Sequence, residues 1–379
     1  MNVGIFHTSI YPHLLLFFYP LVSGAMTLHK IVQYCILAVF CLLALNSCLS
    51  SGILMSEGRE EITIEIGLYS SISPSVGQLF DCFHYSWESQ GIFYQFNVTM
   101  IDRNEVLGYG RALNTDNYDV VVIGASGRQY FHGLQETWRN NIKCFLTNGG
   151  GYVGICGGAN SASQGMETPD SLLGFLINQG ALKIANVYIN DDQTQEWQYL
   201  WKDAGEDHIP ISLALDRSSH PLFGEYPFET RSLTYGGGPG MYPAHVTDPC
   251  LGDLVPLAIF LEEPSTIAPL HYYLYNHGTW DIQQPITTDI QGQYAVLSTL
   301  YNTSSRIILF SPHPEIPPLF DGHIQEYLGV SIYGIPRFVY DWVGDHQTAS
   351  DYNWWMIRRA AAWAAHLPAA HLPPVPPLF

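Results

Sequence analysis

Positive charge is scarce in this chain: 15 Lys and Arg stand against 34 Asp and Glu among 379 residues, a formal net charge of −19 at pH 7. No stretch of the sequence gathers Lys and Arg into a basic patch. Because nucleic-acid phosphates repel a negative protein, we expect no nucleic-acid partner. Charged residues amount to 13% and hydrophobic residues to 47%, so the chain can bury a large core and must build its polar surface mainly from uncharged side chains.

Closely spaced cysteine pairs are absent as well. None of the seven cysteines belongs to a Cys-x-x-Cys pair, so we expect no structural zinc site, and we expect no other metal or cofactor. Cys82, Cys144 and Cys250 can form at most one disulfide, and the sequence leaves its partners open.

The first 48 residues are interpreted as a targeting segment. Residues 26–30, MTLHK, precede an apolar run over 31–45, which leads to Ser47 and Cys48. A basic start, a short apolar core and a small residue before a cysteine are typical of a secretory signal whose cysteine receives a lipid. We therefore expect a signal peptide at 26–48 with lipidation at Cys48, a tether at 49–61, and an extracytoplasmic protein held on the membrane.

Two alternatives stay open at this end of the chain. The apolar run can remain in place as an uncleaved signal anchor. Residues 1–25 hold a second apolar run without a basic start, which we interpret as an upstream extension before a true start at Met26. If Met1 is the start, the two runs can form a membrane hairpin.

Strand-like and helix-like segments alternate along the middle of the chain, which predicts an α/β fold with a parallel sheet. The predicted strands are 62–69, 96–101, 118–123, 152–155 and 306–310, and the predicted helices are 73–90 and 135–146. Further strands are expected at 181–189, 256–262 and 294–300, as additions beside the substrate pocket. In such a sheet, ligands bind at the carboxyl ends of the strands.

The C-terminal region, residues 346–379, is expected to hold a helix over 351–366 and then a tail. Residues 367–377, LPAAHLPPVPP, are so rich in proline that we expect the tail not to pack.

The most informative motif is GGGYVGICGGA at residues 149–159. It carries Cys156 from an apolar strand into a turn crowded with glycine, as in an elbow that presents a nucleophile between a strand and a helix. Gly154, Gly157 and Gly158 lack the Cβ atoms that would keep strand and helix apart. A helix that begins here would favour the thiolate and offer N–H groups to an oxyanion.

A second motif can supply the base. Ser311-Pro312-His313-Pro314-Glu315 follows the predicted strand 306–310. The imidazole of His313 can accept the thiol proton while the carboxylate of Glu315 orients the ring. Either residue alone would be interpreted as an ordinary loop residue, but their spacing and their place after a strand predict a Cys-His-Glu triad.

The pattern Gly-x-Cys-x-Gly, followed late in the chain by His-Pro-Glu, resembles the class I glutamine amidotransferase-like superfamily. Together with Tyr235-Gly236-Gly237-Gly238-Pro239, the cysteine motif is most similar to the domain at the N-terminus of some biotin-protein ligases, which also occurs alone. The resemblance extends over residues 62–327 and implies a flavodoxin-like three-layer α/β sandwich with a mostly parallel sheet and inserted strands, here a domain at 62–345. It implies Cys156 as nucleophile, His313 as base and Glu315 as orienting residue. It does not imply biotin ligation.

The resemblance also indicates where an oxyanion would be held. One donor is the N–H of Gly157, which follows from the elbow. In the family the other donor lies in a Pro-Gly-Gly turn after the third strand, whereas this chain has Gly124-Ala125-Ser126-Gly127 there. The N–H of Ala125 or of Ser126 can serve, because the donor is main chain, and the sequence leaves open which one does.

These residues predict a thiol hydrolase or amidotransferase-like enzyme that acts on an amide or related carbonyl of a small molecule or peptide. An extracytoplasmic location fits hydrolysis of an external amide better than glutamine-dependent biosynthesis. The loop Tyr235, Gly236, Gly237 and Gly238 either contacts the substrate or is a plain turn. The competing hypothesis is a non-catalytic, membrane-anchored binding protein on the same fold, and the sequence does not indicate an oligomeric state.

Overall fold

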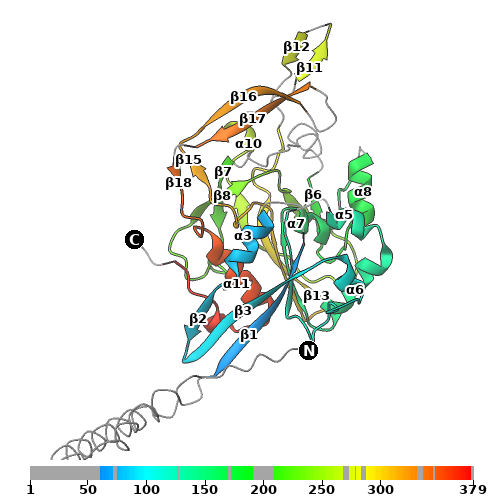
Figure 1. The fold of residues 1–379 in the computed structure, drawn as a ribbon, viewed down its shortest axis with the longest axis vertical. Helices are drawn as coiled ribbons and strands as arrows, with labels where there is room; N and C mark the ends of the chain where they lie inside the picture. Colours follow the sequence, from blue (N-terminus) through cyan, green and yellow to red (C-terminus); the bar gives the residue numbers. More distant parts are fainter. Residues whose placement is uncertain are drawn as a thin grey trace, which may run out of the picture. The chain divides into compact units, whose positions relative to one another are not determined.

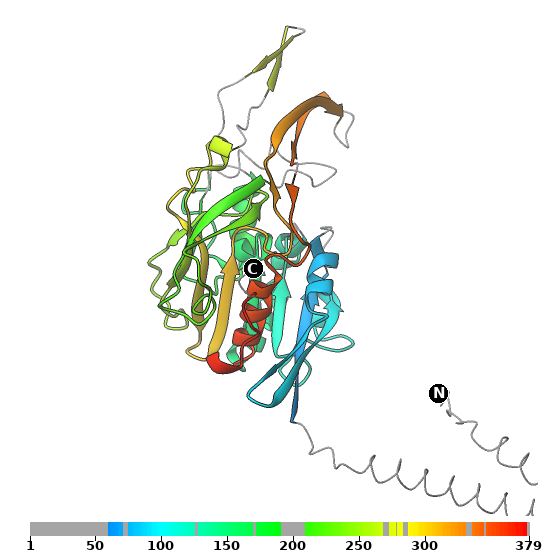
Figure 2. The same cartoon turned by 90° about the vertical axis from the view of Figure 1, so that its left-hand side faces the viewer.

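A 12-stranded sheet forms the centre of the computed structural model (Figure 1 and Figure 2). The structure describes residues 60–70, 75–125, 128–169, 172–190, 209–267, 273–277, 279–282, 287–330, 336–344 and 346–376, all within one compact unit, Glu60–Phe379. The expected extension at 1–25, the signal at 26–48 with Cys48, and the tether up to residue 59 lie outside the described residues. No helix in the described ranges is long and apolar enough to cross a membrane.

Five neighbouring strands of the sheet run parallel, in the order β3, β1, β4, β5, β14. Their bounds are β1 (Glu61–Tyr69), β3 (Ile92–Ile101), β4 (Val120–Ile123), β5 (Gly151–Ile155) and β14 (Ser305–Phe310). Each coincides with a predicted strand, although β3 begins four residues before the predicted start at Phe96. Their carboxyl ends share one edge of the sheet, which is the edge where the sequence predicts the site.

Antiparallel strands extend the sheet beyond β14, in the order β13, β10, β7, β8, and β9 joins β13 with β6 outside it. Their bounds are β6 (Val187–Ile189), β7 (Ile209–Leu215), β8 (Thr230–Tyr235), β9 (Met241–Pro243), β10 (Val255–Phe260) and β13 (Tyr294–Tyr301). The predicted strands 256–262 and 294–300 are confirmed as β10 and β13, whereas only the end of 181–189 forms a strand. The mixed α/β class with a large central sheet and additional strands is confirmed.

Helices cover both faces of the parallel strands. Their bounds are α3 (Ser75–Cys82), α4 (Arg103–Val106), α5 (Arg128–Gly133), α6 (Glu136–Thr147), α7 (Gly157–Ala162), α8 (Leu172–Gly180) and α11 (Trp354–Ala364). Val120 and Val122 pack in the core under α3 and α11, while Val121 and Ile123 pack in a second core with α6, α7 and α8. Because both faces of β4 are buried, this strand is a continuous apolar run rather than an alternating one.

Short elements complete the described part of the chain. They are α10 (Pro264–Ile267), β11 (Tyr273–Asn276), β12 (Thr279–Ile282), β15 (Leu319–Phe320), β16 (His323–Val330), β17 (Pro336–Val343), β18 (His346–Gln347) and the 3₁₀ turn η2 (Ala369–His371). In both views the hairpins β11–β12 and β16–β17 project from the end of the sheet at which the parallel strands finish (Figure 1 and Figure 2).

The predicted helix over 73–90 is wrong beyond Cys82. Residues Ser86–Ser89 form strand β2, which pairs antiparallel with β3. Gln90 and Gly91 make the turn with φ of 52° and 81°, and positive φ at both positions suits the twist of a tight hairpin. The ring of Trp87 stacks on Tyr94 across the two strands, with 5.1 Å between ring centroids. This aromatic pair stabilises a hairpin where the sequence pattern indicates a helix.

The expectation that the C-terminal tail does not pack is also wrong. Leu372 and Pro373 are buried, and Trp87 donates a hydrogen bond from Nε1 to the carbonyl of His371 at 2.9 Å. The buried guanidinium of Arg359 donates to the carbonyl of Pro373 at 2.6 Å. Because proline keeps its carbonyl as an acceptor, donors on α11 and β2 can bind a chain that forms neither helix nor strand.

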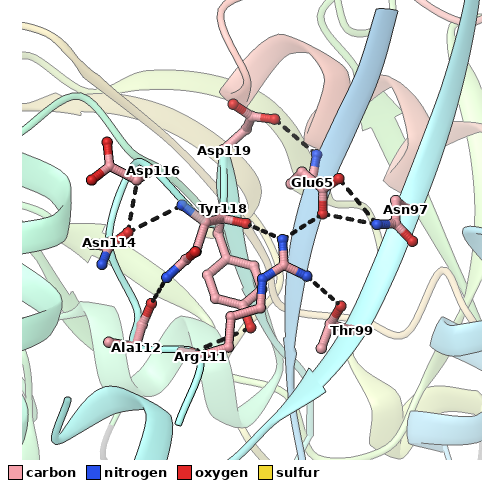
Figure 3. Close-up of polar contacts among 10 residues, drawn as sticks. Glu65, Asn97, Thr99, Arg111, Ala112, Asn114, Asp116, Tyr118 and Asp119 are labelled. Atoms are coloured by element: carbon pink, nitrogen blue, oxygen red, sulfur yellow. Dashed lines mark hydrogen bonds and ion pairs between the residues drawn. The ribbon is translucent and has the colours of Figure 1, made fainter. Parts of the chain in front are cut away.

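A polar network ties the loop before β4 to strands β1 and β3 (Figure 3). Arg111 donates to the carboxylate of Glu65 at 2.8 Å and its guanidinium lies 4.6 Å from the ring centroid of Tyr118. Glu65 also accepts hydrogen bonds from the side-chain amide of Asn97, and its own N–H donates to Asp119 at 2.8 Å. Asp119 immediately precedes β4, so this network lies at the amino end of that strand, away from the carboxyl ends.

Candidate active site

Cys156 lies directly after β5, at the first turn of α7. Its backbone has φ 51° and ψ −104°, a conformation that residues other than glycine rarely adopt and that marks a nucleophile elbow. A Cβ on Gly154 would lie 2.7 Å from the carbonyl oxygen of Gly158, and a Cβ on Gly158 would lie 1.8 Å from that of Ile123. Strand and helix therefore approach as closely as the sequence predicts, and both positions require glycine.

His313 and Glu315 follow the neighbouring strand β14 and form a buried pair. Nδ1 of His313 lies 2.8 Å from Oε1 of Glu315, and the two residues are 3% and 0% exposed. The side chain of Cys156 lies close enough to the His313 ring to act, as a charge and as a hydrogen-bonding partner, on its pKa. Since the carboxylate binds Nδ1, the ring nitrogen left for the sulfur is Nε2. The structure thus brings the three predicted catalytic side chains together in the predicted order.

The electrostatics of this trio favour a charged imidazole. Burial acts to lower the pKa of His313, but the negative charges of Glu315 and of the Cys156 thiolate, with a hydrogen bond to each, raise it well above its usual value. A ring that holds a proton this readily can accept the proton of the neighbouring thiol when the sulfur attacks. The arrangement can therefore hold a thiolate–imidazolium pair.

Two contacts from outside the trio hold these loops in place. The N–H of His313 donates to the carbonyl of Thr234 at 2.7 Å, which joins the loop to the end of β8. Nε1 of Trp354, the first residue of α11, donates to the carbonyl of Glu315 at 2.9 Å. Nothing in the local sequence of Trp354 indicates that its indole holds the main chain of Glu315.

The predicted substrate loop lies beside His313. A Cβ on Gly238 would lie 1.9 Å from the carbonyl oxygen of Ser311, and Gly237 has φ 79°, so the loop at 236–238 passes against the segment that precedes the imidazole. The ring of Tyr235, by contrast, is 2% exposed and packs edge-on against Phe260. The Tyr235 side chain is part of the core, so a contact between this loop and a substrate would be made by the main chain of the glycines.

One of the two possible oxyanion donors before α5 can be placed. Because Gly158 packs on the carbonyl of Ile123, the turn with Gly124 and Ala125 lies beside the start of α7, where Gly157 is the first helical residue. Ser126 lies outside the described residues. The N–H groups of Ala125 and Gly157 are therefore the candidates that the described part of the chain offers.

Tyr130 and Asn160 are polar residues near Cys156 that the sequence analysis did not single out. Tyr130 lies on α5, and its pKa is raised by burial and, next, by the negative charge of the Cys156 thiolate, which the nearby Asn160 amide opposes only in part. Asn160 lies on α7, four residues after Cys156, and is 1% exposed. The four-residue spacing between Cys156 and Asn160 could have indicated Asn160 from the sequence, whereas nothing in the sequence around Tyr130 indicates that it lies near the cysteine.

The other described cysteines differ from Cys156 in their surroundings. Cys82, Cys144 and Cys250 are free thiols, as is Cys156. Burial raises the pKa of Cys82 to about 12, which makes this thiol inert near neutral pH. Cys144 is exposed and serves as an internal reference for an accessible thiol. Within the described ranges, no group of His, Cys, Asp and Glu side chains could hold a metal ion.

No protein-family model matches the chain, and no curated protein matches it. The functional assignment therefore depends on the geometry of the site and on the resemblance carried by its motifs.

Proposed function

We propose that this protein is a thiol hydrolase of the class I glutamine amidotransferase-like type, acting on an amide of a small molecule or peptide outside the cytoplasm. The observation that carries the proposal is the buried His313, which is hydrogen-bonded to Glu315 and has Cys156 as a second neighbour that raises its pKa. When the five parallel strands are numbered 1 to 5 in chain order, their order across the sheet is 2-1-3-4-5. This is the flavodoxin-like order, and it supports the proposed fold family.

The proposed reaction proceeds in two stages. The Cys156 sulfur, its proton on His313, attacks the amide carbon, and the carbonyl oxygen becomes an oxyanion near the N–H groups of Gly157 and Ala125. When the C–N bond breaks, His313 returns its proton to the departing nitrogen, which leaves as an amine or ammonia. Water then attacks the thioester while His313 accepts a proton from it. When the C–S bond breaks, the carboxylic acid leaves and His313 returns the proton to the sulfur, which restores the thiol.

A covalent probe of the site tests this proposal. The full chain is incubated with irreversible electrophilic substrate analogues, such as peptidyl chloromethyl ketones, which alkylate sulfur with loss of chloride, and the labelled peptide is identified by mass spectrometry. We expect label on Cys156, and none on this peptide in Cys156→Ala. If the labelled wild-type cysteine is Cys144 and Cys156 stays unmodified, the protein is a binding protein that uses the fold without the chemistry.

A further inference from the structure

Asn160 presents a buried carboxamide on the Cys156 side of α7. Its N–H donates to the carbonyl of Cys156 at 3.0 Å, so the two residues are one helical turn apart. The Cα–Cβ bonds of a helix tilt toward its N-terminus, so the side chain of Asn160 leans toward the end of α7 at which Cys156 lies. Neither its nitrogen nor its oxygen makes a hydrogen bond of normal length and angle within the described part of the chain, and the phenol of Tyr130 lies within weaker hydrogen-bonding reach of the amide. A buried amide in this state is prepared for a ligand that donates and accepts.

Tyr130 approaches the same place from α5. A Cβ on Gly180 of α8 would lie 2.6 Å from the carbonyl oxygen of Tyr130, so α5 is held tightly against α8 while it also contacts α7. α5 follows β4, whereas His313 follows β14, and these strands flank β5 on opposite sides. Tyr130 therefore lies on the β4 side of Cys156, opposite the loop of His313, and Asn160 lies within its reach. An acyl group on Cys156 that extends away from the imidazole would meet this side.

The polar groups on this side are uncharged. Asn160 offers an amide, and Tyr130 offers a phenol whose raised pKa keeps it neutral. Among the described residues, the charges that act on Tyr130 and His313 are those of Cys156 and Glu315. An ammonium or carboxylate bound beside Asn160 would lose its hydration and gain no opposite charge from these residues, whereas a neutral amide or hydroxyl would gain matched hydrogen bonds.

We propose that Asn160 and Tyr130 form a neutral polar subsite beside Cys156, which binds an uncharged amide or hydroxyl group on the acyl side of the scissile bond. The substrate class is thereby an acyl amide with a neutral polar acyl group, such as a peptide unit, rather than a free amino-acid amide with charged ammonium and carboxylate. This inference rests on the proposed function, because it assumes that Cys156 attacks a carbonyl.

Two small alkylating agents of similar size test the subsite. Iodoacetamide carries a neutral amide and iodoacetate a carboxylate, and both react with the thiolate. Their rate constants at Cys156 are measured at pH 7 by peptide mass spectrometry for the full chain, for Tyr130→Phe, for Asn160→Leu, and for the control Tyr118→Phe. Tyr118 is a buried tyrosine at the amino end of β4, so its variant should keep the wild-type rates.

We expect each subsite variant to lower the iodoacetamide rate by about five- to tenfold, the effect of losing a neutral hydrogen bond, and to change the iodoacetate rate by less than about twofold. Tyr130→Phe removes one oxygen atom, so it keeps the test valid if Asn160→Leu does not fold. An unchanged ratio of the two rates in the variants, with a fast Cys156, overturns the subsite and leaves the nucleophile in place. A Cys156 that reacts no faster than Cys144 in any protein overturns the proposed function and the subsite with it.

Discussion

Replacing Glu315 by Gln should slow the chemistry of Cys156 without changing the shape of the site. The substitution keeps a side chain of the same size 2.8 Å from Nδ1 of His313 but removes its negative charge. A hydrogen bond to a charged group contributes about 1.5–3 kcal/mol, and every 1.4 kcal/mol corresponds to about a tenfold change in an equilibrium. The population of the thiolate–imidazolium pair should therefore fall by about 10- to 100-fold at pH 7.

The assay is the rate constant of iodoacetamide alkylation at Cys156, read by peptide mass spectrometry, with Cys144 of the same sample as the reference thiol. We expect the Cys156 rate to fall by the factor given above and the Cys144 rate to stay the same. A Glu315→Gln protein whose Cys156 reacts within about twofold of wild type, where a charged hydrogen bond would give a larger effect, would refute the role assigned to the carboxylate.

Glu315→Gln should also change how the free energy of unfolding depends on pH. Because the folded pKa of His313 is raised above 6.5, its contribution to stability is complete below that pH and is lost as the pH rises through the folded pKa. Glu315→Gln brings this pKa down. The difference in the free energy of unfolding between wild type and variant should therefore shrink between about pH 6 and pH 10, measured by urea titration. A difference that stays constant over this range would contradict the pKa direction.

Three further results are expected. Gly158→Ala should lower the free energy of unfolding by about 1–3 kcal/mol, because its Cβ would lie 1.8 Å from the carbonyl oxygen of Ile123. Gly77→Ala is the control and should not destabilise the protein, because the space around its Cβ is open. Thermal melting of the two variants tests this difference. Trp354→Phe should slow Cys156 alkylation and move its pH profile, since the main-chain carbonyl of Glu315 loses the hydrogen bond that helps to position this residue. An unmoved profile would make Trp354 structural only. Burial lowers the pKa of His220 from 6.5 to about 4, so stability should fall by about 3 kcal/mol as pH drops from 6.5 to 4, and His220→Phe should remove this loss in urea titrations.

The elements next to Cys156 could be predicted because their sequence determines them locally. An apolar run such as VVVI at 120–123, with both faces buried, has few alternatives to a central parallel strand. The glycines of the elbow likewise report a close approach, which Gly158 makes on Ile123. His313 and Glu315 are two residues apart, so one strand end positions both.

The features that the sequence did not reveal depend on partners far along the chain. The stretch 83–90 forms a hairpin because Trp87 stacks on Tyr94, and Pro373 is buried because Arg359 binds its carbonyl. Tyr130 reaches Cys156 only through the packing of α5 on α7 and α8. Such contacts are decided by tertiary packing, which overrides local propensity.

The central claim is that His313 activates Cys156, and the alkylation rate of that cysteine measures it directly. Iodoacetamide is applied near pH 7 to wild type and to His313→Gln, with the exposed Cys144 followed in each sample. The account predicts that wild-type Cys156 reacts at least about tenfold faster than Cys144 and that His313→Gln removes this advantage while Cys144 is unaffected. Equal rates for Cys156 in the two proteins would contradict it.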